Sequence, residues 1–186
     1  KAVIIATNAR AITELIPSMQ TPASNAVTTW YHLADCPAEA LTDGRSTLVI
    51  DGLRYSNAAG TRGVADPMRP LVNTVVLSNA APDYASDGRV LVSSSALGMN
   101  ESVQFEQLVR KHLATLYGVS TTNWTHVKTY AIADALPQMP SPHRVRQSIT
   151  LTPGVYTAGD YCDVSSINGA LRSARRAVES LLADGF

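Results

Sequence analysis

The stretch of the chain whose residue types could most readily do chemistry is residues 154–182, GVYTAGDYCDVSSINGALRSARRAVESLL. Its apolar beginning is typical of a buried strand, and Asp160 follows directly after it. Open α/β sheets bind their ligands beyond the carboxyl ends of the strands. Asp160 is therefore expected at a ligand-binding edge, where its carboxylate could accept hydrogen bonds from ligand hydroxyl groups.

A helix is predicted after a short polar link, over about residues 166–183. Its first turn would offer unpaired backbone N–H groups and the positive end of the helix dipole. Gly169 and Ala170 carry almost no side chain, so a bulky ligand could approach the backbone there. A valine at position 169 is accordingly expected to block the ligand and leave the fold intact. The apolar stripe that would pack this helix consists of Ile167, Ala170, Leu171, Ala174, Val178 and Leu181.

The same pattern also fits a plain strand, turn and helix without a ligand. In that interpretation Ser165 or Ser166 caps the helix, Asp160 is a loop carboxylate, and Gly169 is a glycine of close packing. A single glycine motif does not distinguish the two interpretations.

Residues 154–178 resemble the C-terminal FAD-binding motif of the flavin-containing amine oxidase superfamily, which includes phytoene desaturases and protoporphyrinogen oxidases. The resemblance lies in Ala158-Gly159-Asp160 after an apolar strand, in the helix start at residues 166–170, and in Ser173-Ala174-Arg175. Less sharply, KAVIIATNA at residues 1–9 resembles the strand that leaves the FAD domain, and ALPQMP at residues 135–140 resembles the returning segment. The family's N-terminal Gly-x-Gly-x-x-Gly fingerprint does not occur in this sequence.

The resemblance implies the C-terminal fragment of an FAD-dependent oxidoreductase, a flavoprotein that removes hydride from an apolar or amine substrate to flavin N5. Asp160 would bind the ribityl–phosphate region of FAD. The backbone around Ile167, Asn168 and Gly169 would face the pyrimidine edge of the flavin and stabilise negative charge at N1–C2=O. The complete set of implied cofactor-binding residues is Gly159, Asp160, Ser166, Ile167, Asn168, Gly169 and Ala170. No catalytic side chain is identified.

The implied partners are a small apolar or amine substrate and a missing N-terminal FAD-binding segment. Because that segment would hold most of the cofactor, this chain alone is expected to be inactive and not to bind FAD. The start of the chain, KAVII without an initiator methionine, also suggests a fragment.

The elements around this motif predict two domains. Residues 10–139 are expected to form an α+β substrate-binding domain, a mixed, mostly antiparallel sheet covered by a helix over residues 101–118. Asn100 is expected to cap that helix and Gly118 to end it. Residues 1–9 and 140–186 are expected to form an incomplete α/β, Rossmann-like FAD-binding domain from both chain ends.

Composition narrows the function classes. Of the 186 residues, 45% are hydrophobic and 16% are charged, and the net charge is zero, which gives no electrostatic footprint for nucleic acid. No apolar run approaches the roughly 20 residues of a membrane-spanning helix, so membrane association is not evident. The two cysteines make neither a disulfide framework nor a metal cluster, and a cytoplasmic setting is the default. The four histidines, His32, His112, His126 and His143, have no metal-ligand spacing, and no metal is expected.

His112 is expected on the polar side of its helix, and Cys162 fits a packed residue better than a redox thiol. The aromatic residues that either line a substrate cavity or belong to the core are Trp30, Tyr31, Tyr55, Trp124 and Tyr130. The alternative function is a non-catalytic α+β module that binds a small ligand and whose last helix only packs on its sheet.

Overall fold

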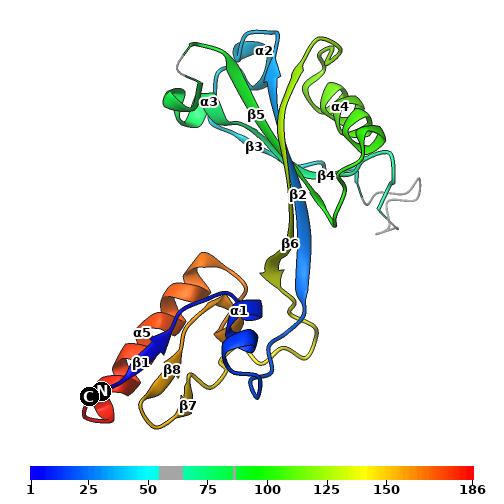
Figure 1. Ribbon diagram of the computed structural model, residues 1–186. Helices are drawn as coiled ribbons and strands as arrows, with labels where there is room; N and C mark the ends of the chain where they lie inside the picture. The colour runs from blue at the N-terminus through cyan, green and yellow to red at the C-terminus, as the bar shows by residue number, and fades with distance from the viewer. Residues whose placement is uncertain (55–64, 86) are drawn as a thin grey trace. The chain divides into compact units, whose positions relative to one another are not determined.

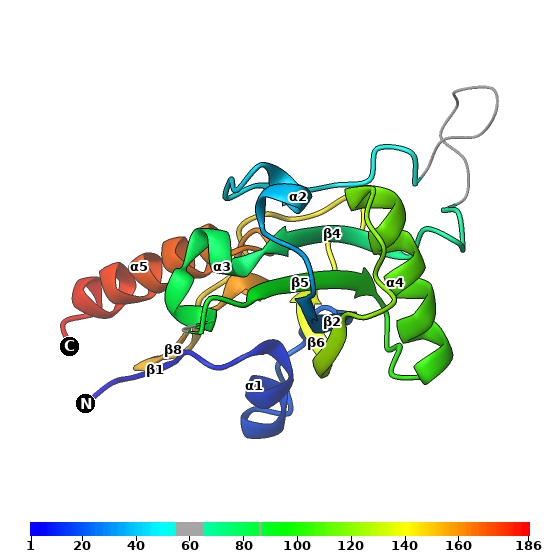
Figure 2. The ribbon, with the colours of Figure 1, turned by 90° about the horizontal axis from the view of Figure 1, so that it is seen from above.

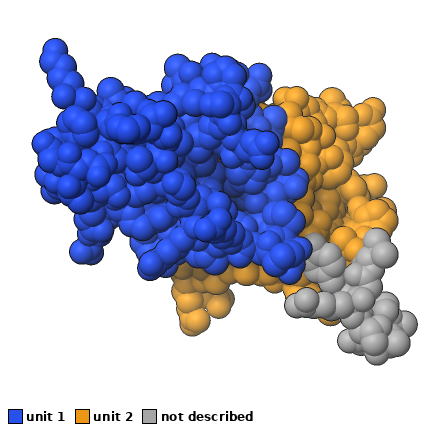
Figure 3. Space-filling view, turned by 90° about the horizontal axis from the view of Figure 1, so that it is seen from below, with its two compact units in different colours: residues 1–25, 133–186 blue, residues 26–132 orange. Residues whose placement is uncertain are grey.

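The computed structural model of the chain describes residues 1–54, 65–85 and 87–186 (Figure 1). It contains two compact units, one formed by residues 1–25 and 133–186 and the other by residues 26–132 (Figure 3). We call the first the terminal unit and the second the central unit. Each has a hydrophobic core of its own. Residues 10–25 and 133–139 belong to the terminal unit, whereas the sequence pattern suggested the central one.

The terminal unit is built on a three-stranded sheet with the order β1-β8-β7. Strand β1 (Val3–Ile5) pairs in parallel with β8 (Val155–Thr157), and Val3 lies opposite Val155. Strand β7 (Thr150–Thr152) pairs with β8 in the antiparallel direction. The expectation that the two ends of the chain lie together is therefore confirmed.

Two helices and one short turn complete the terminal unit. They are α1 (Ala9–Leu15), the 3₁₀ turn η2 (Asp160–Cys162) and α5 (Ile167–Ala183). Asn8 caps α1, because its side chain accepts a hydrogen bond from the N–H of Ala11 at 2.8 Å. The buried core of the unit consists of Ala9, Ile12, Ile149, Tyr156, Ala158, Tyr161, Cys162 and Ala177.

Helix α5 packs on this unit through small residues rather than through its large apolar ones. Its buried positions are Gly169, Ser173 and Ala177, which are spaced four residues apart and so share one face. Of the predicted stripe, Ala174 and Leu181 pack against the core. The prediction is wrong for Ile167, Leu171 and Val178, which are exposed together with Leu182. Periodicity identifies an apolar face, but it does not tell which element covers that face.

The central unit is built on a five-stranded sheet with the order β3-β4-β5-β2-β6, of which β2 begins before residue 26 and β6 ends after residue 132. The strands are β2 (Ser24–Ala34), β3 (Leu48–Val49), β4 (Leu71–Val76), β5 (Val90–Leu97) and β6 (Thr125–Pro137). The pairs β3–β4, β4–β5 and β2–β5 are antiparallel. With α2 (Glu39–Thr42), α3 (Leu77–Ala80), η1 (Pro82–Ala85) and α4 (Val103–Tyr117), the fold is a mixed α+β arrangement with antiparallel sheet.

Helix α4 covers one face of the central sheet (Figure 2). The predicted helix end at Gly118 is confirmed, because this residue has a φ of 67° that favours glycine. The expected cap at Asn100 is wrong. Ser102 is the N-cap, and its hydroxyl accepts a hydrogen bond from the N–H of Phe105 at 3.2 Å. Asn100 instead donates its side-chain N–H to the carbonyl of Leu97.

The face of α4 that contacts the sheet carries polar as well as apolar groups. His112 is buried, so the expectation that it lies on the polar side of the helix is wrong. Its Nδ1 accepts the N–H of Leu71 at 3.2 Å, and its Nε2 donates to Asp51 at 2.9 Å. Each polar atom of the ring thus has a partner, which is what permits its burial.

The aromatic residues divide between the two faces of the central sheet. Trp30 and Trp124 belong to the buried core beneath α4. Tyr31 alternates with Trp30 along β2 and makes an edge-to-face contact with Tyr130, with ring centroids 5.9 Å apart. Tyr55 lies outside the described residues.

Candidate functional site

The candidate site is the segment from the end of β8 to the first turn of α5, and it contains all seven predicted cofactor-binding residues. Gly159 lies two residues beyond the end of β8 and is anchored to α5. Its N–H donates to the hydroxyl of Ser173 at 2.9 Å, and its carbonyl lies 2.8 Å from the same hydroxyl. A Cβ at Gly159 would lie 2.2 Å from the Tyr161 ring, so this ring explains the glycine.

Asp160 opens η2 and is partly exposed. Its backbone carbonyl accepts the N–H of Asp163 at 3.2 Å. None of the described residues forms a hydrogen bond or ion pair with its carboxylate. The carboxylate can therefore accept hydrogen bonds from a ligand without breaking a contact of the fold.

Helix α5 begins with Ser166 as its N-cap, which is one of the two caps that the sequence suggested. The Ser166 hydroxyl accepts the N–H of Gly169 at 3.0 Å, and its carbonyl accepts the N–H of Ala170 at 3.0 Å. Ile167 and Asn168 are exposed on the first turn, where backbone N–H groups have no partner inside the helix. This turn can face a group that carries negative charge.

Gly169 is required by the local packing. It is buried, and a Cβ at this position would lie 1.9 Å from the carbonyl oxygen of Val164. The glycine is thus needed by the turn that precedes the helix, as in the close-packing interpretation. The expectation that valine at 169 would leave the fold intact is wrong, because any side chain there collides with backbone.

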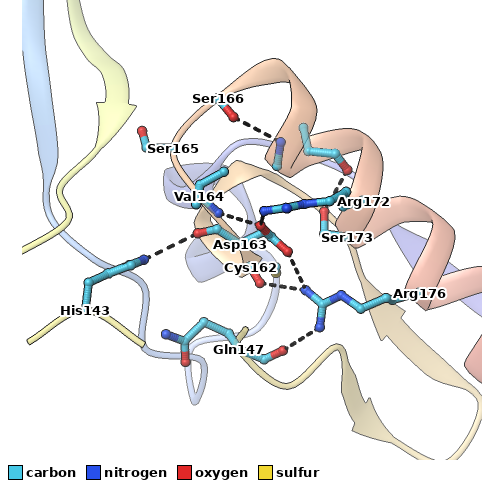
Figure 4. A network of polar contacts seen from close by, with 12 residues as sticks. His143, Gln147, Cys162, Asp163, Val164, Ser165, Ser166, Arg172, Ser173 and Arg176 are labelled. Carbon is cyan, nitrogen blue, oxygen red and sulfur yellow. Dashed lines mark hydrogen bonds and ion pairs between the residues drawn. The ribbon is translucent and has the colours of Figure 1, made fainter. Parts of the chain in front are cut away.

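Asp163 holds the link between β8 and α5 in place (Figure 4). Its side chain is only 2% exposed and forms ion pairs with Arg172 and Arg176. It also accepts the backbone N–H of Val164 at 2.8 Å. Burial acts to raise the pKa of Asp163, but the hydrogen bonds from Val164 and Arg172 outweigh it, so its pKa lies below the usual value.

Arg176 extends this network to neighbouring backbone. It donates to the carbonyl of Cys162 at 2.8 Å and to the carbonyl of Gln147 at 3.1 Å. His143 Nε2 lies 3.4 Å from the carbonyl of Asp163 (Figure 4). Sequence reasoning missed Asp163, Arg172 and Arg176. The available signal was a carboxylate just before a helix whose polar face carries arginines.

Cys162 is fully buried in the core of the terminal unit. Burial raises the pKa of its thiol to about 11, so the thiol stays protonated at neutral pH. Reactive cysteines are thiolates in exposed, electropositive surroundings. The geometry therefore fits a packed residue.

The described residues contain no group of three or more histidine, cysteine, aspartate or glutamate side chains that could hold a metal ion. Among the same residues, no helix has both the length and the apolar character needed to cross a membrane.

One comparison with known proteins identifies a family for this chain. A model of the family described as flavin containing amine oxidoreductase matches residues 1–182. A search of curated proteins finds no match.

Two solved structures are similar in fold. An oxidoreductase from Methanosarcina mazei is 13% identical with a TM-score of 0.50, over 94% of this chain and 37% of that one. The PF1083 protein from Pyrococcus furiosus is 12% identical with a TM-score of 0.55, over 100% of this chain and 41% of that one. The chain thus spans about two fifths of the length of these structures.

Proposed function

Because the chain belongs to the family of flavin-containing amine oxidoreductases, we propose that it forms the C-terminal part of an FAD-dependent oxidoreductase. The proposed reaction is transfer of hydride from an apolar or amine substrate to flavin N5, as in the phytoene desaturase-like branch of the superfamily. The bound flavin supplies the redox chemistry, and the residues of this chain supply orientation and electrostatics.

One observation carries the proposal: the carboxylate of Asp160, which has no partner among the described residues, lies between the carboxyl end of β8 and the first turn of α5. Ligands of open α/β sheets bind at such strand ends, and β1 and β8 are parallel there. In the proposed role, Asp160 accepts hydrogen bonds from hydroxyl groups of the ribityl chain. The strand pair would then be the Rossmann-like remnant of the FAD domain.

The first turn of α5 would stabilise negative charge on the flavin ring. Ile167 and Asn168 are exposed, and the helix N-terminus favours negative charge by about 0.3–2 kcal/mol. Gly159, Ser166, Gly169 and Ala170 would act mainly through the backbone, because Ser166 caps the helix and Gly169 fits beneath Val164. These residues would keep the N–H groups of the turn aimed at the pyrimidine edge.

The partner we propose is a dinucleotide-binding segment outside residues 1–186. The exposed apolar face of α5 supports this, since Ile167 and Leu171 are 80% and 64% exposed. Removing such apolar surface from water stabilises the covered state by about 25 cal/mol per Å² of buried area. The length of the similar structures leaves room for such a segment. Without it, this chain should bind FAD weakly or not at all.

The substrate would bind on the face of the central sheet opposite α4. Tyr31 and Thr29 lie on that face of β2, and Ser95 contacts Thr29 through their hydroxyl groups at 2.9 Å. Tyr130 from β6 contacts Tyr31 edge to face. This surface combines aromatic area with a few hydroxyl groups, which suits a small apolar or amine substrate.

The experiment is to purify the protein with its proposed dinucleotide-binding segment and record its visible absorbance spectrum. Retained flavin that a panel of amines or unsaturated hydrocarbons reduces without oxygen would support the proposal. A protein that retains no flavin, even after addition of FAD, would contradict it and favour a non-catalytic ligand-binding module.

A further inference from the structure

The polar face of α5 borders a second site, separate from the first turn. We infer that a cavity of about 280 Å³ in the terminal unit binds the phosphate group of a small anionic ligand. The cavity is lined by Arg146, Asp163, Arg172, Arg175, Arg176 and Glu179. Four of these six side chains are guanidinium groups.

The charges of the cavity do not balance. Four arginines face two carboxylates, which leaves an excess of two positive charges. Asp163 cannot compensate Arg146 or Arg175, because its buried carboxylate already pairs with Arg172 and Arg176. Glu179 pairs with Arg175 at 2.8 Å, but both side chains are exposed, and such surface pairs hold weakly.

The arginine N–H donors also outnumber the acceptors. Arg146 has no hydrogen-bond or ion-pair partner among the residues that the structure describes. Within the same residues, the Nε of Arg176 is buried and lacks a partner. Arginine presents a planar fork of donors that matches phosphate oxygens. A phosphate monoester carries about two negative charges at neutral pH, which matches the excess, whereas a single carboxylate carries one.

This site is independent of the proposed flavin position. Most of the cavity is lined by Arg172, Arg175, Arg176 and Glu179 of α5, beyond the first turn, and by Arg146 from the segment before β7. Asp163 is the one lining residue from the link between β8 and α5, and it is not among the residues proposed to contact the flavin. A failure to find bound FAD would therefore not contradict the phosphate site. A failure to find phosphate binding would likewise not contradict the proposed flavin site.

The test is calorimetric titration of the 186-residue chain with inorganic phosphate and with pyrophosphate at low ionic strength. We expect saturable binding that weakens as salt is added. Arg146→Gln and Arg175→Gln should each weaken it about tenfold, because each removes a charge-assisted donor. Arg10→Gln is the matched control, since Arg10 forms the same kind of exposed i,i+4 pair with Glu14 as Arg175 does with Glu179. It should leave binding unchanged.

Two further titrations distinguish the source of the phosphate. ADP is compared with phosphatidylcholine vesicles that contain or lack phosphatidic acid. Stronger binding of ADP than of pyrophosphate assigns a nucleotide, and binding of the acidic vesicles alone assigns a lipid headgroup. No saturation by any of these probes, or equal weakening by Arg10→Gln, would overturn the inference. Circular dichroism of each variant checks that the exposed substitutions leave the fold unchanged.

Discussion

Ser173 and Gly159 form a two-sided contact between α5 and the end of β8. The Gly159 N–H donates to the Ser173 hydroxyl at 2.9 Å, and that hydroxyl lies 2.8 Å from the Gly159 carbonyl and 2.7 Å from that of Ala170. Ser173 is fully buried. This contact fixes the end of β8 to α5. Asp160 follows directly after Gly159, so the contact also holds Asp160 near the first turn of α5.

Replacing Ser173 should therefore loosen the candidate site. Ser173→Ala leaves the partly buried N–H of Gly159 without its acceptor, which should lower the free energy of unfolding by about 1–3 kcal/mol. Urea unfolding measures this change. Ser180→Ala on the same helix is the control, since no side-chain hydrogen bond of Ser180 is recorded in the described part of the chain, and it should change stability little. Equal stability of the two variants would show that the Ser173 contact is not structural.

Gly169→Ala should destabilise the terminal unit even though alanine favours helices. The added methyl group would lie 1.9 Å from the Val164 carbonyl oxygen, and such overpacking costs about 1–3 kcal/mol or more. The gain in helix propensity is only about 1 kcal/mol. Thermal unfolding should show a lower midpoint than for Asn168→Ala, an exposed neighbour on the same turn. A midpoint at or above the wild-type value would contradict the close packing.

Asp163 should make the terminal unit sensitive to acid. Its pKa in the folded chain lies below the unfolded value of about 3.9, so the unfolded state takes up the proton first. The stabilisation is complete above about pH 5 and is lost as the pH falls through the folded pKa. Asp163→Asn should be less stable than wild type at neutral pH and lose less on acidification.

Unfolding curves between about pH 3 and pH 7 test this sign. Glu179→Gln, which removes an exposed carboxylate of the same helix, serves as the control. If its acid dependence fell as much as that of Asp163→Asn, the buried network would not be the cause.

The same substitution at two leucines of α5 should change the stability of the isolated chain by different amounts. Leu171 is exposed, so Leu171→Ser should change stability by less than about 0.5 kcal/mol. Leu181 packs against the core, and Leu181→Ser should cost clearly more. Denaturant titration compares them. In the protein that carries the proposed dinucleotide-binding segment, Leu171→Ser should become costly as well, and continued neutrality would argue against that partner.

The sequence predicted features that depend on local pattern. The strands at residues 3–5 and 155–157 and the helix end at Gly118 follow from apolar runs and end signals, which also limited the cap of α5 to Ser165 or Ser166. These signals lie within a few residues of the element they define. These signals can therefore be read from the sequence without knowledge of the tertiary fold.

The features that the sequence missed depend on contacts between elements. His112 is buried because Asp51 and the N–H of Leu71, both distant in sequence, satisfy its ring. Asp163 is buried because two arginines from the next helix reach it. A residue type alone does not reveal such partners.

The central claim is that the segment between β8 and α5 binds flavin, and Asp160 tests it most directly. Asp160→Ala removes a carboxylate for which the described residues provide no partner, so the fold should not change. In the protein with its dinucleotide-binding segment, we measure bound flavin per polypeptide by absorbance after purification. We predict depleted flavin at unchanged thermal stability of the apoprotein, because charge-assisted hydrogen bonds of about 1.5–3 kcal/mol are lost. Full flavin occupancy in Asp160→Ala would contradict the claim.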